Sequence, residues 1–388
     1  MTKLLTIPFF DWKQLYLERR KEYLEIFDRT ASRGGFILQQ DVDDFETELE
    51  RFLGVKHAIA VSDATNAMLL GWRAMGLRQG DEVIVPSHSF LAAAQSIHFA
   101  GGVPVPCELA PDGMADAADM EQRVTRKTRA LMPVHVNGRM ADIDAIGEVA
   151  RRHNLLVVED SAQALGAKLR GQAAGTAGVW GCFSFYPSKV LGTFGDAGAL
   201  VTNDDALAEK VVRMRNHGAN ADKSIEKDNT VWGTNCRLDN IHAAILAYKM
   251  TWYGEAVARR RAIAARYHEG FRDLAGLALP PAPAAEADRF DVFQNYELEA
   301  DRRDELRAFL AERGIGTIIQ WGGLALHQMT GLGFTQRLPK TDLFFQRCLL
   351  LPMNHMLADD EVDYIIENVR AFDRLEAQTK TEAVRTVA

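Results

Sequence analysis

The stretch Ser184-Phe-Tyr-Pro-Ser-Lys-Val-Leu-Gly-Thr-Phe-Gly-Asp-Ala-Gly198 places a single lysine, Lys189, between an apolar run and a glycine-rich turn. Desolvation or a neighbouring cation lowers the pKa of a lysine and makes its amine able to form a Schiff base. The three glycines of the turn let the backbone approach a bound group closely. A tight loop with a solvated lysine is the alternative, and this segment alone leaves both interpretations open.

Outward from this stretch, short β-rich runs alternate with helix-like patterns between about residues 55 and 205. The runs are 58–62, 82–86, 129–136, 155–160, 180–185 and 199–203. Several are almost wholly apolar, as expected for strands that are covered on both faces. The alternation predicts a mostly parallel sheet wrapped by helices, which is a three-layer α/β/α domain.

Two further motifs follow strands of this predicted sheet, where ligands of such sheets bind. The run 155–160 ends in Glu159 and Asp160, and a carboxylate there could keep a heterocyclic nitrogen protonated. Asp-Ala-Thr-Asn at 63–66 follows another strand and precedes a helical run, so its hydroxyl and amide groups suit a phosphate. Ordinary helix caps are the alternative for both motifs.

A smaller α+β lobe is predicted after the large one. A helix-prone segment at 240–271 leads into a Pro/Ala-rich loop at 279–287, then a strand at 293–298 and a helix at 303–313. An amphipathic helix at 359–375 follows. We place the large domain at residues 1–255 and the small C-terminal domain at residues 256–388.

Composition limits the possible functions. The chain has 388 residues, 47% of them apolar, and a net charge of −8, so it has no overall attraction for nucleic acid or anionic membranes. No apolar run reaches the 18 or so residues of a membrane helix. The four cysteines are widely scattered, which fits neither a zinc site nor a disulfide framework. We therefore expect a cytoplasmic protein with no metal, no nucleic acid partner and no membrane partner.

In combination these motifs resemble the DegT/StrS-type sugar aminotransferases, which are pyridoxal-phosphate (PLP) enzymes of the aspartate-aminotransferase fold, PLP transferase fold type I. The resemblance runs from about Gly34 to Phe372. Its markers are Gly80-Asp-Glu-Val-Ile-Val-Pro-Ser87, Pro133-Val-His-Val-Asn-Gly138, Glu159-Asp-Ser-Ala-Gln163, Cys182-Phe-Ser-Phe-Tyr-Pro-Ser-Lys189, Gly195-Asp-Ala-Gly198 and Asn235-Cys-Arg-Leu-Asp239. The chain departs from many relatives at Asp63-Ala-Thr65 and at Gln320-Trp-Gly-Gly323, beside the expected sugar site.

The resemblance implies a role for each matching residue. Lys189 would be the catalytic residue, holding the cofactor as an internal aldimine and moving protons. Asp160 would pair with the pyridine nitrogen, and Gln163 would lie near the ring hydroxyl. The other cofactor contacts implied are Ala64, Thr65, Asn66, Phe90, Ser184 and Asn235. Phe90 would stack on the cofactor face, with an ordinary core aromatic as the alternative. Asn235 would reach the phosphate of a neighbouring subunit, which implies a homodimer with active sites at the interface.

The implied activity is transfer of an amino group to a nucleotide-linked keto-deoxysugar, with glutamate as the expected donor. Two half-reactions, with pyridoxamine phosphate (PMP) as the intermediate form of the cofactor, would give ping-pong kinetics. One alternative is a sugar dehydratase of the same family, but those relatives replace the lysine with histidine. Another is a non-catalytic regulatory or binding protein that keeps the fold. A third is a generic amino-acid transaminase, for which we find no recognisable arginine for a substrate carboxylate.

Overall fold

A central sheet organises the large lobe of the computed structural model, which describes residues 5–220 and 222–387. In spatial order its strands are β3 (Val103–Cys107), β2 (Glu82–Pro86), β4 (Thr128–Leu131), β5 (Leu156–Val157) with β6 (Glu159–Asp160), β9 (Gly181–Ser184), β10 (Gly198–Thr202) and β1 (His57–Val61). The β5–β6 segment joins two four-stranded halves, because β5 pairs with β4 and β6 pairs with β9. Only β10 runs antiparallel to its neighbours, so the prediction of a mostly parallel sheet is confirmed.

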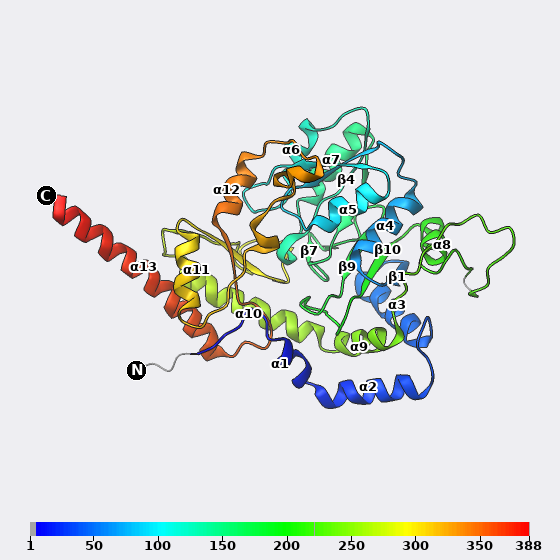
Figure 1. Ribbon diagram of the computed structural model, residues 1–388, viewed down its shortest axis with the longest axis horizontal. Coiled ribbons are helices and arrows are strands. Elements are labelled where there is room, and N and C mark those ends of the chain that lie inside the picture. The colour runs from blue at the N-terminus through cyan, green and yellow to red at the C-terminus, as the bar shows by residue number, and fades with distance from the viewer. Residues whose placement is uncertain (1–4, 221, 388) are drawn as a thin grey trace.

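Helices cover both faces of this sheet (Figure 1). Side chains alternate along β1, so that Ile59 and Val61 face one core while Ala58 and Ala60 face the other. The first core includes residues of α4 (Ala64–Met75), α5 (Leu91–Phe99), α7 (Ile143–His153) and α8 (Asp205–Met214). The second includes residues of α3 (Gln40–Leu53) and α9 (Asn240–Met250). The three-layer prediction is therefore confirmed.

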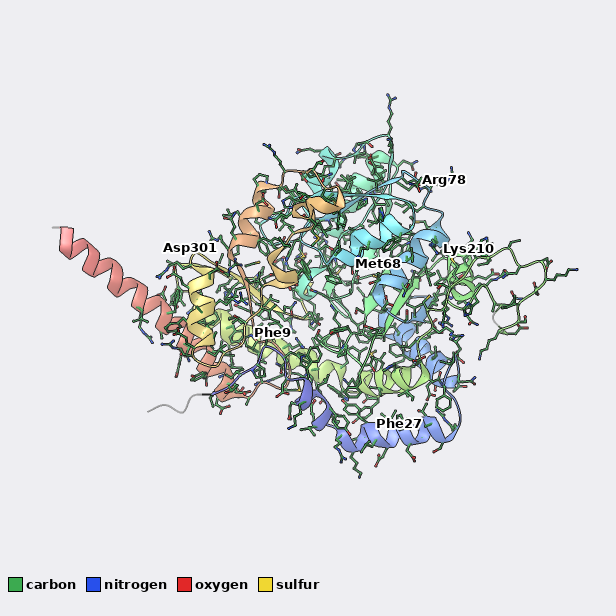
Figure 2. All side chains as sticks on the ribbon, in the orientation of Figure 1. Phe9, Phe27, Met68, Arg78, Lys210 and Asp301 are labelled. Carbon is green, nitrogen blue, oxygen red and sulfur yellow. The ribbon has the colours of Figure 1, made fainter. Side chains whose placement is uncertain are left out.

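Two N-terminal helices extend along the lower edge of the large lobe. They are α1 (Trp12–Leu17) and α2 (Arg20–Ser32), and α2 packs Tyr23 and Ile26 against α9. Figure 2 shows Phe27 on this outer edge and Met68 in the middle of the lobe. The exposed fractions agree, because Phe27 is 53% exposed whereas Met68 is 1% exposed. The short α6 (Ala117–Gln122) follows β3 in the chain.

The small lobe is an antiparallel sheet with helices around it. Its strands are β11 (Leu277–Ala278), β13 (Tyr296–Ala300) and β14 (Cys348–Leu351), and its helices are α10 (Tyr253–Phe271), α11 (Arg303–Ala311), α12 (Pro339–Arg347) and α13 (Asp359–Val387). Short strands β7 (Lys168–Leu169), β8 (Gln172–Ala173) and β12 (Arg289–Phe290) form a third sheet. Ile7 packs into the small-lobe core, so the N-terminal segment contributes to both lobes. The predicted boundary at 255/256 stays a prediction.

Several details differ from the expected elements. The strand expected at 293–298 is β13 at Tyr296–Ala300, and the helix expected at 359–375 is α13, which extends to Val387. The helix-prone segment 240–271 is two helices, because α9 packs on the large-lobe core and α10 on the small-lobe core, and the chain turns between them at Thr251 and Trp252. Strand β3, with alternating valine and proline, was not predicted from the sequence. The run 129–136 is a strand only as far as Leu131.

Two further observations concern the cysteines and the helices. All four cysteines are free and buried. Within the described part of the chain, no helix has both the length and the apolar character needed to cross a membrane.

Candidate active site

A cavity of about 550 Å³ lies at the carboxyl ends of the parallel strands. Strands β1, β6 and β9 all run in the same direction, so the residues that follow them meet at one edge of the sheet. Seven of the residues predicted from the sequence line this cavity, namely Ala64, Thr65, Phe90, Asp160, Gln163, Ser184 and Lys189. Small-lobe residues close its other side, among them Gln294, Asn295 and Trp321.

Lys189 lies in the turn after β9, partly buried against the cavity. Burial lowers the pKa of its amine to about 8, and the nearby carboxylate of Asp160 opposes this only in part. A substantial fraction of the amine is therefore neutral near physiological pH, which is the nucleophilic form. The alternative of an ordinary solvated lysine does not match this environment.

The two carboxylates at the end of β6 have different surroundings. Glu159 accepts hydrogen bonds from the backbone N–H groups of Gly175, Ala177 and Gly178 at 2.7–2.9 Å, and its Oε2 lies 2.9 Å from Nε2 of His135. Its oxygens are thus engaged with structural partners, and Glu159 does not line the cavity. Asp160 does line it and is therefore the carboxylate available to a ligand.

Asp160 is buried, and desolvation raises the pKa of its carboxyl group. Its Oδ1 accepts the N–H of Ala162 at 3.0 Å, but no helix of the described residues begins there, so Asp160 is not a helix cap. A desolvated carboxylate next to a cavity is stabilised by a cationic group placed opposite it.

The N-terminus of α4 forms another wall of the cavity. Asp63 caps this helix by accepting the N–H of Asn66 at 2.8 Å, while Ala64 and Thr65 face the cavity. Gly198 lies so close that an added Cβ would be 2.4 Å from the carbonyl carbon of Asp63, so glycine is required there. Helix dipole, hydroxyl and backbone N–H groups make this end suitable for a phosphate.

Asn66 is directed elsewhere. Its side-chain amide donates to Asp63 Oδ2 at 2.7 Å and to Ser62 Oγ at 3.0 Å, and the residue does not line the cavity. Asn235 also lies outside the lining, on an exposed segment paired with Asn216 by a single β-bridge. Cofactor contacts by Asn66 and Asn235 therefore stay predictions.

Phe90 and Gln163 lie on two other walls of the cavity. Phe90 is 56% exposed, which rules out an ordinary core aromatic and leaves its ring free to cover a bound group. Gln163 accepts the N–H of Asn137 through Oε1 at 2.7 Å, so its orientation is fixed.

Sequence reasoning missed the small-lobe residues of the cavity. Gln294 donates to the carbonyl of Ser188 and accepts the N–H of Val190, both at 2.9 Å. It lies more than 100 residues from Lys189 in the chain, and no local pattern links the two segments. Trp321, from the stretch 320–323 expected beside the sugar site, also lines the cavity. His327 is a lobe contact, because its ring bonds to Ser87 and Asp342.

These features suit a flat heterocyclic cofactor with a phosphate tail. The partly buried amine of Lys189 and the desolvated carboxylate of Asp160 line the same cavity. The N-terminus of α4, with the hydroxyl of Thr65, forms another part of its wall. The close approach at Gly198 leaves the backbone of residues 63 and 64 at the cavity wall. The residues present therefore fit pyridoxal phosphate.

Comparison with known proteins agrees with this geometry. The sequence model of the DegT/DnrJ/EryC1/StrS aminotransferase family matches residues 18–370 of this chain. A dTDP-3-amino-3,4,6-trideoxy-alpha-D-glucose transaminase of Streptomyces venezuelae is 37% identical over 94% of this chain and 95% of its own. A "pleiotropic regulatory protein" of Geobacillus stearothermophilus is 36% identical over 95% of this chain and 99% of its own.

Among solved structures, S. venezuelae DesV in complex with a ketimine intermediate superposes with a TM-score of 0.89. It is 37% identical and covers 95% of this chain and 98% of its own. The match extends over both lobes, as the resemblance predicted. The chain belongs to the DegT/DnrJ/EryC1/StrS aminotransferase family, whose members are PLP-dependent.

Proposed function

We propose that this protein is a PLP-dependent aminotransferase that acts on a nucleotide-linked keto-sugar, with glutamate as the amino donor. The observation that carries the proposal is the placement of Lys189 and Asp160 on one cavity, the amine with a lowered pKa and the carboxylate desolvated. Similarity to curated sugar transaminases at 33–37% identity supports the substrate class.

The residues that would hold the cofactor divide by chemistry. Thr65, Ser184 and the N-terminus of α4 would bind the phosphate, Asp160 the ring nitrogen, and Phe90 the ring face. When bound, PLP supplies an electron sink that stabilises negative charge on the carbon that loses its proton. Asp160 would favour the protonated form of the ring nitrogen and so keep that sink effective.

Lys189 has two tasks in this account. Its neutral amine would attach the cofactor, and once released it would carry a proton between the donor carbon and the cofactor as general base and then acid. A pKa of about 8 suits both directions of transfer near neutral pH. Tyr186 and Trp321, which also line the cavity, would limit water around the reacting atoms.

The proposal includes a homodimer. Between α8 and α9 a long segment loops out from the large lobe (Figure 1) and carries Trp232, which is 93% exposed, and Asn235. Phe90 and Tyr186, beside the cavity mouth, are also about half exposed. Apolar exposure of this kind is typical of an interaction surface. Asn235 would thus reach the phosphate site of a second copy, and a cytoplasmic location stays a prediction.

A visible absorption spectrum tests the proposal. Purified protein with PLP should show a cofactor band that requires Lys189 and that bleaches when glutamate is added. A band that persists with glutamate would contradict the donor assignment. If no Lys189-dependent band formed at all, a binding or regulatory role, as in the name of the Geobacillus relative, would replace the enzymatic one.

A further inference from the structure

A second cavity, of about 280 Å³, adjoins the first and is lined by none of the residues assigned to the cofactor or to catalysis. Asn295 lines both cavities, so the two spaces lie next to each other. The large lobe contributes His88 and Asn137 to the second cavity, and the small lobe contributes Glu297 from β13 and Phe344 from α12. This space therefore lies between the lobes, beside the reacting atoms of the proposed function.

Glu297 is the chemically unusual residue of this cavity. Its side chain is only 4% exposed. One carboxylate oxygen, Oε2, accepts hydrogen bonds from Asn137 Nδ2 at 2.5 Å and Gln320 Nε2 at 3.0 Å. The other, Oε1, is buried and has no partner among the described residues. Burying an unpaired carboxylate oxygen is costly, so a hydrogen-bond donor from outside the chain is expected next to it.

His88 lies directly beside Glu297. Its Nδ1–H donates to the carbonyl of Gly113 at 3.0 Å, and its Nε2 lies 3.3 Å from Glu297 Oε2, which is within ion-pair distance but without hydrogen-bond geometry. The rings of Trp321, Phe344 and Phe345 surround His88 with centroids 4.7–5.5 Å away. The imidazole is therefore held in place and cannot rotate freely to find another partner.

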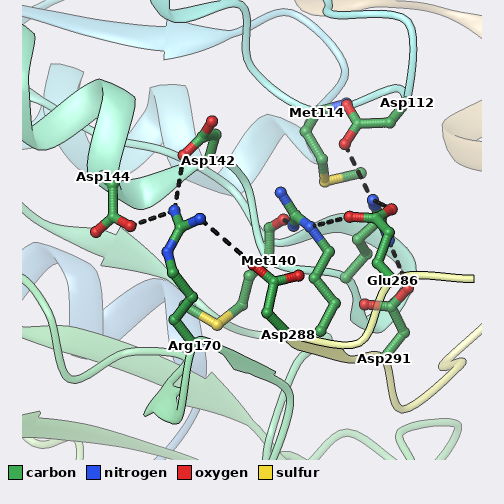
Figure 3. A network of polar contacts seen from close by, with 11 residues as sticks. Asp112, Met114, Met140, Asp142, Asp144, Arg170, Glu286, Asp288 and Asp291 are labelled. Atoms are coloured by element: carbon green, nitrogen blue, oxygen red, sulfur yellow. Dashed lines mark hydrogen bonds and ion pairs between the residues drawn. The ribbon is translucent and has the colours of Figure 1, made fainter. Parts of the chain in front are cut away.

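Arg139, the one arginine among the described residues that line the cavity, is already paired with carboxylates. Arg139 forms ion pairs with Asp112, Glu286 and Asp291, and Figure 3 shows these three carboxylates gathered together. Glu299 adds another carboxylate to the lining, paired with Arg347 at 3.4 Å. With Arg139 engaged, the cavity presents acceptors, which favour an ammonium or hydroxyl group and repel a carboxylate or phosphate.

Hydrogen bonds connect this acidic cavity to the cofactor cavity. The backbone N–H of Asn137 bonds to Gln163, its Nδ2 bonds to Glu297, and its Oδ1 accepts from Asn295 at 2.8 Å. Asn137 adopts a left-handed conformation with φ of 59°, which few residues tolerate as well as asparagine. The turn at Asn137 therefore places the Asn137 side chain between the two cavities.

We propose that the second cavity is a substrate subsite for an amine- or hydroxyl-bearing part of the sugar, with Glu297 as the specificity-determining residue. The inference rests on the proposed function, because it assumes that a sugar occupies the neighbouring site. It predicts that sugars with a carboxylate at this position are rejected. The phosphates of the nucleotide must then lie away from this cavity.

Ligand-observed NMR with the cofactor-loaded protein tests the subsite, with D-glucosamine, D-glucose and D-glucuronate as probes. We expect D-glucosamine to bind at least about tenfold more tightly than D-glucuronate, with D-glucose between them. Glu297→Gln keeps the shape and should remove this preference. Glu305→Gln, on the exposed face of α11, is the matched control and should keep it.

Equal binding of the three sugars, no binding of any, or an unchanged preference in Glu297→Gln would overturn the subsite. The melting temperature of Glu297→Gln shows whether this variant folds. If it does not fold, Glu297→Asp, which withdraws the carboxylate by one methylene, is used instead and should weaken D-glucosamine binding. Unchanged binding in Glu297→Asp would overturn the assignment. Bleaching of the cofactor band by glutamate is recorded on the same samples. Bleaching without sugar preference refutes the subsite alone, whereas preference without bleaching refutes the aminotransferase function alone.

Discussion

Gln294 holds the backbone on both sides of Lys189. Its Nε2 donates to the carbonyl of Ser188, and its Oε1 accepts the N–H of Val190, each at 2.9 Å. Gln294 is itself anchored, because its carbonyl accepts a hydrogen bond at 2.9 Å from Arg260, which is buried in α10. The position of the lysine on the large lobe thus depends on a side chain of the small lobe.

Replacing Gln294 should therefore reduce activity without removing the chemistry. Gln294→Ala frees the turn that carries Lys189, and a displacement of about 1 Å costs up to about 100-fold in rate. We expect kcat to fall about 10- to 100-fold while the Lys189-dependent band still forms. Gln294→Glu, which keeps the acceptor for Val190 but loses the donor to Ser188, should be intermediate. If Gln294→Ala kept the wild-type kcat, the hydrogen bonds of Gln294 to Ser188 and Val190 would have no role in positioning Lys189.

The lowered pKa of Lys189 predicts a pH-dependent attachment of the cofactor. Because the amine reacts only when neutral and its pKa is about 8, raising the pH from 7 to 9 increases the neutral fraction about tenfold. Stopped-flow mixing of cofactor-free protein with PLP should show this rise, with its midpoint near pH 8. A midpoint near 10.5, the ordinary value for lysine, would contradict the desolvated environment.

The substitution Asp160→Asn should have opposite effects on stability and on activity. Burial raises the pKa of this carboxyl group, so the stability of the cofactor-free protein falls as the pH rises from the ordinary pKa of 3.8 through the raised pKa, and the loss is complete above it. The neutral, similarly shaped Asn should therefore raise the melting temperature of the cofactor-free protein at pH 7. It should also lower kcat about 100-fold or more, since the charge facing the cofactor ring is lost. A variant with full activity would exclude Asp160 from the site.

The dimer proposal predicts complementation between inactive chains. If Asn235 acts across the interface, Lys189→Ala disables the site of its own subunit, whereas Asn235→Ala disables the site of the neighbouring subunit. Mixed subunits should recover up to about a quarter of wild-type activity, because one site in a heterodimer is intact and half of random dimers are mixed. Mixtures no more active than the separate variants would place Asn235 outside the neighbouring site.

Local motifs were sufficient to predict most of the large lobe, but not all of its strands. Apolar runs with strand periodicity predicted the sheet, and Lys189, Asp160 and Thr65 follow strands that end at the same edge, so their convergence is a consequence of parallel pairing. The strand at Val103–Cys107 was missed because its prolines argue against a strand. It is nevertheless at the edge of the sheet, where missing N–H groups are tolerated.

The rest of the site depends on contacts between distant segments. Neither Gln294 nor Glu297 belongs to a recognisable motif. Their roles appear only in the structure, where Gln294, just before β13, contacts the turn at 188–190 and Glu297, in β13, contacts Asn137. The two adjacent carboxylates, Glu159 and Asp160, could not be told apart in the sequence. Only the structure shows that Glu159 is engaged with the loop at 175–178 while Asp160 faces the cavity.

The central claim is that this site delivers an amino group from glutamate to a nucleotide-linked keto-sugar by way of Lys189. The most direct measurement is mass spectrometry of the sugar product formed with ¹⁵N-glutamate and a panel of nucleotide-linked keto-sugars. We predict a ¹⁵N-labelled amino-sugar with wild-type protein and none with Lys189→Ala. Wild-type protein that binds PLP and reacts with glutamate, yet labels no sugar in the panel, would contradict it.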